Sequence, residues 1–320
     1  EDMPRLDWSG SCPSLLLEPS RTNLVSYSEY FDVFQLYYTS NATNTGNTIE
    51  APDGGIAFLY NIGNGYIFLL NTADNTTKSF SFYAKSDTNG YQISYRTPDG
   101  TNTTTSLSNT EWKRITATGV HSNSNLMLHD NRALGSTGNV AFWGVQLEEG
   151  SYPTSYIPTY GVSQTRLVDS ATASNVASLI GQTEGTIFID VNMSAENGDV
   201  INIKPISGSF YANGIGLGNL SQSLRLQVHK PSGTTQVGYP LSVGGRFKFA
   251  IRYDSNNLAF FVNGSKFYDN PVTIDWSVNL NDVALYDALT TGRLSAKNNK
   301  QTLLFPTALS DSECIALTTI

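Results

Sequence analysis

Polar residues that could bind a ligand occur on two predicted strands in the second half of the chain. Arg225, Gln227 and His229 alternate with apolar residues in the stretch "SLRLQVHK". Lys248 and Arg252 occupy alternate positions in "RFKFAIRYD". Alternate residues of a strand share one face, so each polar set is opposite an apolar one. If the two strands are neighbours, this polar stripe could cradle a glycan, an acidic one included. The alternative is an ordinary solvated sheet face.

Aromatic side chains are the second set of candidates, because a sugar ring packs its apolar C–H face on Tyr or Trp. Tyr91 and Tyr95 could line one face of a first sandwich. Trp112 shares its face with Arg114, and Trp276 lies in the stretch "TIDWSVNL". For both tryptophans, a place in the core is the alternative to a place in a binding site.

Patterns typical of catalysis are missing from the sequence. The three histidines, His121, His129 and His229, stand apart, and no motif of a zinc protease, a serine hydrolase or a phosphate-binding loop occurs. Glu148 and Glu149 are adjacent, so in a strand they point to opposite faces and cannot pair across a substrate. We interpret them as a solvated strand end and predict no catalytic residue.

Cofactors and metals are not expected either. Asp74, Asp99 and Asp130 lie in predicted loops, but they lack the spacing of a calcium-binding loop, which favours a role in turns. Cys12 and Cys314 stand at opposite ends of the chain and are predicted to be unpaired thiols.

The composition excludes two classes of partner. The net charge is −8, whereas a nucleic-acid surface needs clustered Lys and Arg. No apolar run approaches the roughly 18 residues that a membrane-spanning helix requires. We therefore expect neither nucleic-acid binding nor membrane insertion.

Period-two alternation of apolar residues recurs along the chain and predicts an all-β protein. Examples are Phe80, Phe82 and Ala84 in "KSFSFYAKS" and Ala141, Trp143, Val145 and Leu147 in "NVAFWGVQLE". The one well-marked helix is "LSDSECIALT", with Ser310 and Glu313 at the spacing of a capping box. We expect strand over about 40% of the residues or more and helix under about 10%, against the usual mixture of both.

The length of 320 residues favours two domains, here two antiparallel β-sandwiches of the jelly-roll kind in tandem. We predict an N-terminal extended segment at 1–28, a jelly roll at 29–160, a connector at 161–178 and a second sandwich at 179–320. The stretch 150–178, which includes the connector, is expected to be ordered, because Tyr152, Tyr156, Ile157 and Tyr160 offer too much apolar surface for a free linker. The segment 1–28 is expected to pack along the connector.

Three stretches resemble a module of bacteriophage tail fibres and other phage receptor-binding proteins: "PRLDWSGSCPSLLLEPSRTNLVSYSEYF" (4–31), "EWKRITATG" (111–119) and "GNVAFWGVQLEEGSYPTSYIPTYGVSQTRLVD" (138–169). The middle part is similar to jelly-roll carbohydrate-binding modules. The second half resembles a laminin-G, or concanavalin-A-like, lectin domain in "RFKFAIRYDSNNLAFFVNGSKFY" (246–268) and "LFPTALSDSECIALT" (304–318).

The resemblance implies a non-enzymatic adhesin at the tip of a tail fibre in the virion, which recognises a host cell-surface polysaccharide or glycoconjugate. It also implies a homotrimer attached to other tail proteins. Jelly-roll carbohydrate modules often hold a structural calcium through an Asp of the final strand, which "AFWGVQLE" lacks. The alternatives are a polysaccharide-degrading enzyme on a lectin-like sandwich and a purely structural fibre segment.

Overall fold

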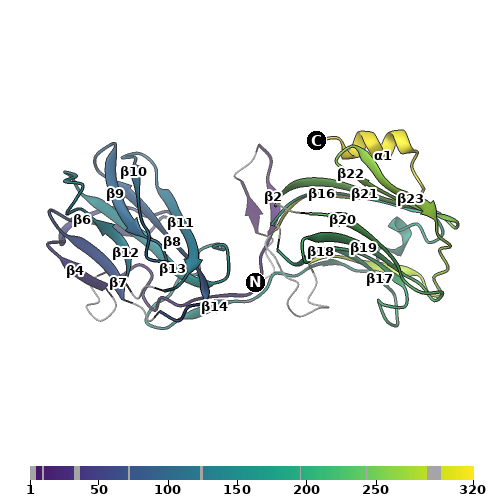
Figure 1. Ribbon diagram of the computed structural model, residues 1–320, viewed down its shortest axis with the longest axis horizontal. Coiled ribbons are helices and arrows are strands. Elements are labelled where there is room, and N and C mark those ends of the chain that lie inside the picture. Colours follow the sequence, from purple (N-terminus) through teal and green to yellow (C-terminus); the bar gives the residue numbers. More distant parts are fainter. Residues whose placement is uncertain are drawn as a thin grey trace. The chain divides into compact units, whose positions relative to one another are not determined.

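The computed structural model describes residues 5–8, 11–31, 37–70, 73–122, 125–194, 196–241, 244–286 and 297–320. Strand makes up 54% of the structure and helix 4%, which confirms the predicted all-β class. The chain divides into two compact units (Figure 1). The first sandwich comprises residues 20–167, and the second sandwich comprises residues 168–320 together with 1–19.

The second sandwich consists of two antiparallel sheets. The seven-stranded sheet has, in spatial order, β1 (Leu6–Asp7), β2 (Ser14–Leu17), β25 (Lys297–Phe305), β16 (Gly185–Met193), β21 (Gly245–Tyr253), β22 (Asn257–Val262) and β23 (Ser265–Pro271). The six-stranded sheet has β15 (Ala171–Ala173), β24 (Leu280–Tyr286), β17 (Gly198–Pro205), β18 (Gly214–Leu220), β19 (Ser223–His229) and β20 (Thr235–Pro240). A short 3₁₀ turn, η1, covers Ala177–Leu179. Figure 1 shows the two sheets as stacked layers.

Alternation along the strands decides which side chains enter the core of the second sandwich. Ile187, Ile189 and Val191 of β16 are almost fully buried, as are Leu224 and Leu226 of β19. They belong to one cluster that joins the two sheets. The residues between them on β19, among them the polar candidates of the sequence, therefore lie on the outer side of the six-stranded sheet.

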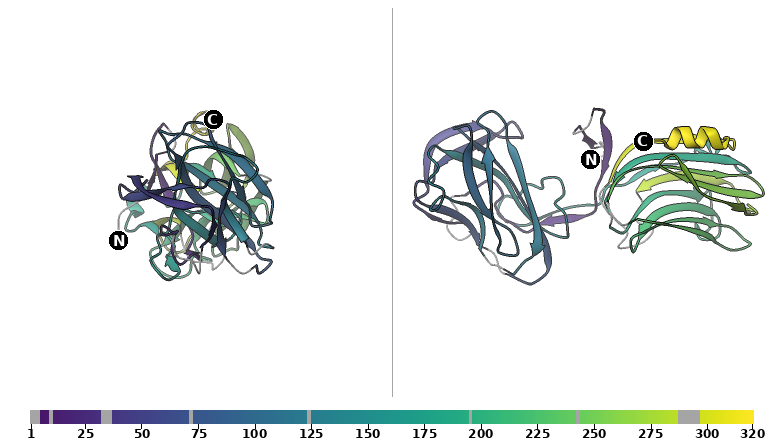
Figure 2. Two further views of the ribbon diagram at one scale, coloured as in Figure 1. Left: turned by 90° about the vertical axis from the view of Figure 1, so that its left-hand side faces the viewer. Right: turned by 45° about the horizontal axis from the view of Figure 1, so that its top comes forward.

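The helix α1 (Asp311–Thr318) covers the outer face of the seven-stranded sheet (Figure 2). The predicted capping box is confirmed, since the side chain of Ser310 accepts from the backbone of Glu313 and the Glu313 side chain returns to the Ser310 backbone. Cys314 is fully buried with Ala250 and Phe261 of the sheet below. Cys314 and the exposed Cys12 are both free thiols.

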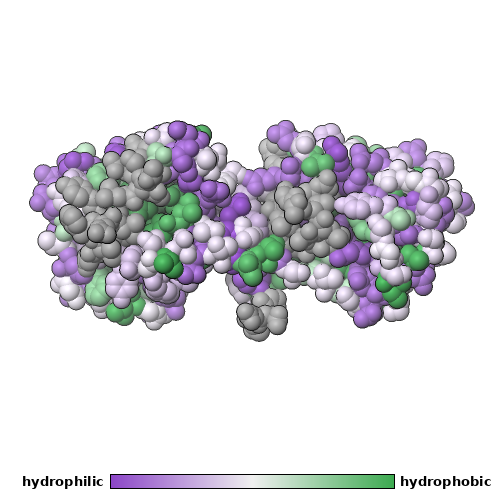
Figure 3. All heavy atoms as spheres, turned by 90° about the horizontal axis from the view of Figure 1, so that it is seen from below, coloured by the Kyte–Doolittle hydropathy of each residue, from purple (hydrophilic) through white to green (hydrophobic). Residues whose placement is uncertain are grey.

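The first sandwich also has two antiparallel five-stranded sheets. One contains β10 (Asn102–Leu107), β9 (Tyr91–Arg96), β12 (Asn125–Asp130), β7 (Tyr66–Leu70) and β4 (Tyr37–Ser40). The other contains β11 (Lys113–Val120), β8 (Thr77–Ser86), β13 (Val140–Glu149), β6 (Ile56–Asn61) and β5 (Thr43–Glu50). A separate ribbon pairs β3 (Arg21–Asn23) with β14 (Gln164–Arg166). The surface in Figure 3 is mainly hydrophilic, with hydrophobic residues in small separate groups.

A bulge in β13 corrects one expectation from the alternation. The register against β8 shifts between Trp143 and Gln146, and Gly144 has φ +64°, a conformation that favours glycine. Trp143 therefore packs in a cluster outside the sheet, whereas Val145 and Leu147 enter the main core. The sequence pattern had placed these side chains on one face.

The residues after β13 fold back onto the outer side of that strand. Tyr156 packs on Trp143 with ring centroids 4.4 Å apart, and its hydroxyl donates to Glu29 at 2.7 Å. Trp143 in turn contacts Tyr83 at 5.4 Å. The connector around residue 156 is thus ordered as expected, and it occupies the aromatic surface of the first sandwich with the chain's own tyrosine.

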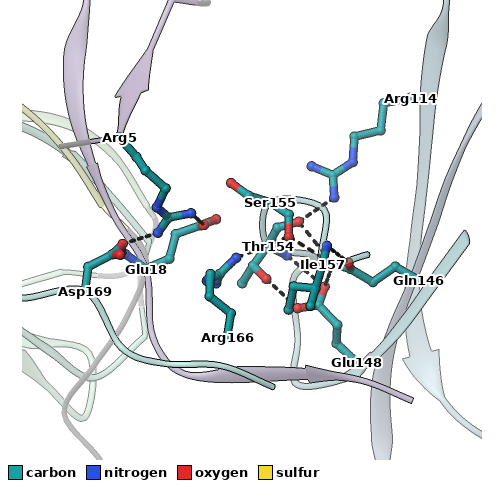
Figure 4. A network of polar contacts seen from close by, with 10 residues as sticks. All are labelled: Arg5, Glu18, Arg114, Gln146, Glu148, Thr154, Ser155, Ile157, Arg166 and Asp169. Carbon is teal, nitrogen blue, oxygen red and sulfur yellow. Dashed lines mark hydrogen bonds and ion pairs between the residues drawn. The ribbon is translucent and has the colours of Figure 1, made fainter. Parts of the chain in front are cut away.

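Glu148 is the polar centre of this fold-back (Figure 4). Its carboxylate is fully buried and accepts from the side-chain amide of Gln146 at 2.7 Å and from the backbone N–H of Thr154 at 2.9 Å. The hydroxyl of Thr154 donates to its other oxygen. The interpretation of Glu148 as a solvated strand end is therefore wrong, while the next residue, Glu149, keeps 74% of its side chain exposed.

The N-terminal segment expected at 1–28 is divided between the two units. Leu15, Leu16 and Leu17 of β2 pair with β25 and extend the seven-stranded sheet. Arg5 donates to Glu18 and Asp169, which ties the start of this segment to the chain that enters the second sandwich (Figure 4). The part from Ser20 onward also lies along the connector, through the β3–β14 ribbon, so both parts of the segment contact residues 161–178. The unit boundaries at 19/20 and 167/168 thus differ from those read from the sequence.

Candidate functional site

A groove on the outer face of the six-stranded sheet has the features of a ligand site. Its volume is about 70 Å³, and it crosses three neighbouring strands. Asp199 and Asn202 of β17 form one side, and Arg225 and Gln227 of β19 form the other. Phe210, Tyr211 and the strand β18 complete the lining.

The floor of the groove is a row of glycines on β18. Gly214, Gly216 and Gly218 alternate with Ile215 and Leu217, which are buried in the core on the other side. A Cβ atom at Gly216 would lie 3.0 Å from Oδ1 of Asn202 and 3.1 Å from Cζ of Phe210. At Gly218 it would lie 2.9 Å from Oδ1 of Asp199. The hollow therefore exists because these positions lack side chains.

The guanidinium of Arg225 has unusual room. Its partners in the neighbouring strands are Gly218 on β18 and Gly238 on β20, neither of which carries a side chain. Within the described part of the chain, the guanidinium of Arg225 has no hydrogen bond or ion pair. Beside it, the amide of Gln227 donates to Gln236 at 3.1 Å, so Gln227 is held in place along the sheet.

Two aromatic rings lie at one end of the groove. Phe210 lies over the glycine row, because a Cβ at Gly214 would come within 2.6 Å of its ring. Tyr211 is 57% exposed. Both rings meet His229 edge to face, at centroid distances of 5.0 Å for Phe210 and 5.3 Å for Tyr211. An exposed aromatic ring beside polar groups suits the C–H face of a sugar.

His229 supports these rings from beneath. Nδ1 lies 2.9 Å from the hydroxyl of Thr234, and burial lowers the pKa of the imidazole. Only 4% of His229 is exposed, whereas the sequence favoured a solvent-facing side chain at the wet end of a strand. The reason is the loop that carries Phe210 and Tyr211, which the strand pattern does not reveal.

A buried lysine lies below the acidic side of the groove. The ammonium group of Lys297 on β25 donates to the backbone carbonyl oxygens of Asp199 and Val200, the latter at 3.0 Å. Burial lowers the pKa of Lys297 to about 7. At the surface, the Asp199 carboxylate accepts from the amide of Asn202 at 3.2 Å. This side of the groove is therefore held by contacts from both sheets.

The structure separates the two halves of the predicted polar stripe. Arg225 and Gln227 line the groove, but Lys248 and Arg252 belong to β21 in the opposite sheet. Lys248 donates to the backbone of Thr319 at 2.8 Å, and Arg252 pairs with Asp311 at the start of α1. The expectation that these strands are neighbours is wrong, because the chain changes sheets between β20 and β21. Lys248 and Arg252 hold the C-terminal helix.

The predicted aromatic candidates lie mostly in the interior. Tyr91 is 3% exposed, and its hydroxyl is 3.2 Å from Nε2 of His129, which lies on a strand and not in a loop. Tyr95 packs against Phe82 inside the first sandwich.

Both tryptophan candidates also have structural contacts. Trp112 donates to the carbonyl of Glu50 at 2.9 Å and packs beside the Trp143 cluster. Trp276 donates to the carbonyl of His229 at 3.0 Å and packs on Tyr253.

Several groove residues were not singled out from the sequence: Asp199, Asn202, Phe210, Tyr211 and the glycine row. One signal was present. The stretch "GIGLG" (214–218) places glycine at every outward position of a strand, which leaves backbone uncovered and marks a close approach. The loop residues carried no signal, because their position depends on packing against β18 and β19.

Among the residues that the structure describes, no group of three or more His, Cys, Asp or Glu side chains is arranged to hold a metal ion. No helix in the same residues is long and apolar enough to cross a membrane.

Comparison of the sequence with protein-family models and with curated proteins finds no match. Among solved structures, a sialidase carbohydrate-binding module (CBM40) of Ruminococcus gnavus bound to α2,3-sialyllactose is similar, with a TM-score of 0.39 and 14% identity over 48% of this chain and 95% of that one. The binding domain of botulinum neurotoxin serotype G has a TM-score of 0.40 and 14% identity over 49% of this chain and 42% of that one. Values this low mark a general likeness, so the architecture rests on the strand pairing of this chain.

Proposed function

We propose that this protein is a non-enzymatic adhesin that binds a host cell-surface glycan in the groove of the second sandwich. The groove carries this proposal, because it combines an exposed aromatic ring with a carboxylate, amides and a guanidinium over a floor without side chains. Sugars need this mixture, since their ring faces are apolar and their hydroxyls both donate and accept.

Binding without catalysis fits the distribution of carboxylates. Glycosidases typically place two carboxyl groups on either side of the scissile bond. Among the described residues that line the groove, Asp199 is the only carboxylate. Release of reducing ends or unsaturated sugars from host capsule would overturn this part of the proposal.

The resemblance of residues 4–31, 111–119 and 138–169 to phage tail-fibre modules supports a place at the tip of a fibre in the virion, with other tail proteins and two further copies of the chain as partners. The apolar residues of the extended segments are covered within the chain itself, since Leu17 is 2% and Ile157 5% exposed. The trimer therefore rests on the resemblance. Light scattering should give a mass near three times 34.8 kDa, and a mass near one chain would contradict it.

Glycan arrays and whole-cell binding test the function directly. A shallow polar groove gains little after ordering costs, so we expect dissociation constants of about micromolar to millimolar per site, strengthened by several copies. Tyr211→Ala should reduce binding at least about tenfold, because an aromatic platform is lost. Tyr160→Ala removes a similarly exposed tyrosine (67%) from the first sandwich and is the matched control. Equal binding by both variants would contradict the assignment of the groove.

A further inference from the structure

We infer that the groove selects an acidic sugar, whose anionic group pairs with Arg225 while a hydroxyl of the same sugar donates to Asp199. This inference rests on the proposed function and adds the chemical class of the ligand. Three observations carry it: the position of Arg225 between two glycines, the position of Asp199 across one of them, and the buried cation beneath Asp199.

Arg225 is a cation without a counter-charge in a position that is open on both sides. Its neighbours in register are Gly218 and Gly238, so no side chain on either adjacent strand reaches across it. Within the described residues, the guanidinium of Arg225 makes no hydrogen bond and no ion pair, whereas Arg246 and Arg252 on β21 are both paired with aspartates. A guanidinium presents a planar fork of donors that matches an oxyanion with two contacts.

Asp199 lies in the same cross-strand row as Arg225, on the other side of Gly218. The pairing is Asp199 with Gly218 and Gly218 with Arg225. Two strand spacings, about 10 Å, separate the backbones of β17 and β19, and the Asp199 carboxylate leans over Gly218, where a Cβ would lie 2.9 Å from Oδ1. Among the described residues, no hydrogen bond or ion pair joins Asp199 to Arg225. The Asp199 carboxylate accepts hydrogen bonds and cannot receive an anion, so a ligand in this row must offer a donor on one side and an acceptor on the other.

The charge balance decides between a neutral and an acidic sugar. The ammonium group of Lys297 lies against the backbone of Asp199, and the Asp199 charge stabilises it from above. Because the pKa of Lys297 is lowered to about 7, this ammonium group balances the Asp199 charge only in part at neutral pH, while the positive charge of Arg225 has no counter-charge in the described part of the chain. A neutral sugar would leave this guanidinium without a counter-charge in the complex, whereas a sugar with a carboxylate or sulfate group would supply that counter-charge.

The test compares glycans that differ only in the acidic group. Binding is measured for glucuronate-ended against glucose-ended disaccharides, for sialyllactose against lactose, and for 6-sulfated against unmodified galactose. These arms separate uronic acids, sialic acids and sulfated sugars as sources of the same charge. The wild type should bind at least one acidic member about tenfold or more tightly than its neutral partner, as expected for a hydrogen bond to a charged group.

Arg225→Gln should abolish this preference by lowering the affinity for the acidic member at least about tenfold more than the affinity for its neutral partner. Lys230→Gln is the control. Lys230 lies just after β19 and outside the groove lining, and its ammonium group donates to Ser232. This variant also loses one positive charge, but it should keep the preference for the acidic sugar. Circular dichroism and thermal unfolding confirm that both variants fold. Equal affinity of the wild type for each acidic and neutral pair, or a preference that survives in Arg225→Gln, would overturn the inference while the proposed function stands. No binding to any glycan would overturn both.

Discussion

Replacement of Glu148 by Ala tests the fold-back that completes the first sandwich. The carboxylate is fully buried and accepts three hydrogen bonds, one from Gln146 and two from Thr154. Its removal leaves buried donors without an acceptor, at about 1–3 kcal/mol for each group. With three such donors, the lower part of this range gives a total of about 3–5 kcal/mol. We expect a loss of this size in the free energy of unfolding of the first sandwich, or a fall in Tm of roughly 9–15 °C.

The adjacent residue supplies a matched control. Glu149 keeps 74% of its side chain exposed and lies 3.6 Å from the ammonium group of Lys78. Lys78 is buried but keeps its shorter contact with Asp74 at 2.7 Å when Glu149 is removed. The long contact of the exposed Glu149 is worth about 0–1 kcal/mol, so Glu149→Ala should remain within about 1 kcal/mol of the wild type. Calorimetry and urea unfolding measure both variants, and the transition of the second sandwich should not move. If the two variants unfold alike, the Glu148 carboxylate does not hold the fold-back in place.

Three further changes test other features. Gly216→Ala should destabilise the second sandwich by about 1 kcal/mol and weaken glycan binding about tenfold, because the added methyl group presses on Asn202 and Phe210. Gly119→Ala on β11 of the first sandwich is the control. Unaltered glycan binding by Gly216→Ala would argue against the groove as the binding site. The pKa of Lys297 is lowered from 10.5 to about 7 in the folded protein. Between pH 7 and pH 10.5 the unfolded chain therefore binds more protons than the folded one, and the free energy of unfolding should rise with pH over this interval. Urea unfolding at pH 6 and pH 9 should show this rise in the wild type and not in Lys297→Met. Trp112→Ala should lower the stability of the first sandwich by about 2 kcal/mol without altering glycan binding, since its contacts are structural; reduced binding by a fully stable variant would restore Trp112 as a ligand contact.

Local rules predicted the elements of this protein well. Alternation located the strands and, on β16 and β19, the buried side of each, because period two follows from the geometry of a single strand. The capping box at Ser310 was equally local and is present. Arg225 and Gln227 were placed on one outer face for the same reason.

Features that depend on non-local packing were not predictable in this way. Alternation does not reveal to which sheet a strand belongs, and Lys248 and Arg252 therefore appeared beside Arg225 although β21 lies in the opposite sheet. The bulge at Gly144 reversed the faces of Val145 and Leu147 relative to Trp143. Glu148 was interpreted as solvated because its burial is produced by residues that fold back after the strand has ended.

The pairing of β2 with β25 has a consequence for how the protein is made. Leu15 meets Asn299 in register, so β2 leaves the ribosome long before β25 and cannot pair with it until residues 297–305 have been made. The first sandwich, at 20–167, can fold in the meantime as a continuous unit. Contacts so distant in sequence slow folding and leave strand edges unpaired while synthesis continues. A chain that begins at residue 168 would retain the groove but lack β1 and β2 beside β25, and we expect it to aggregate more readily through that uncovered edge.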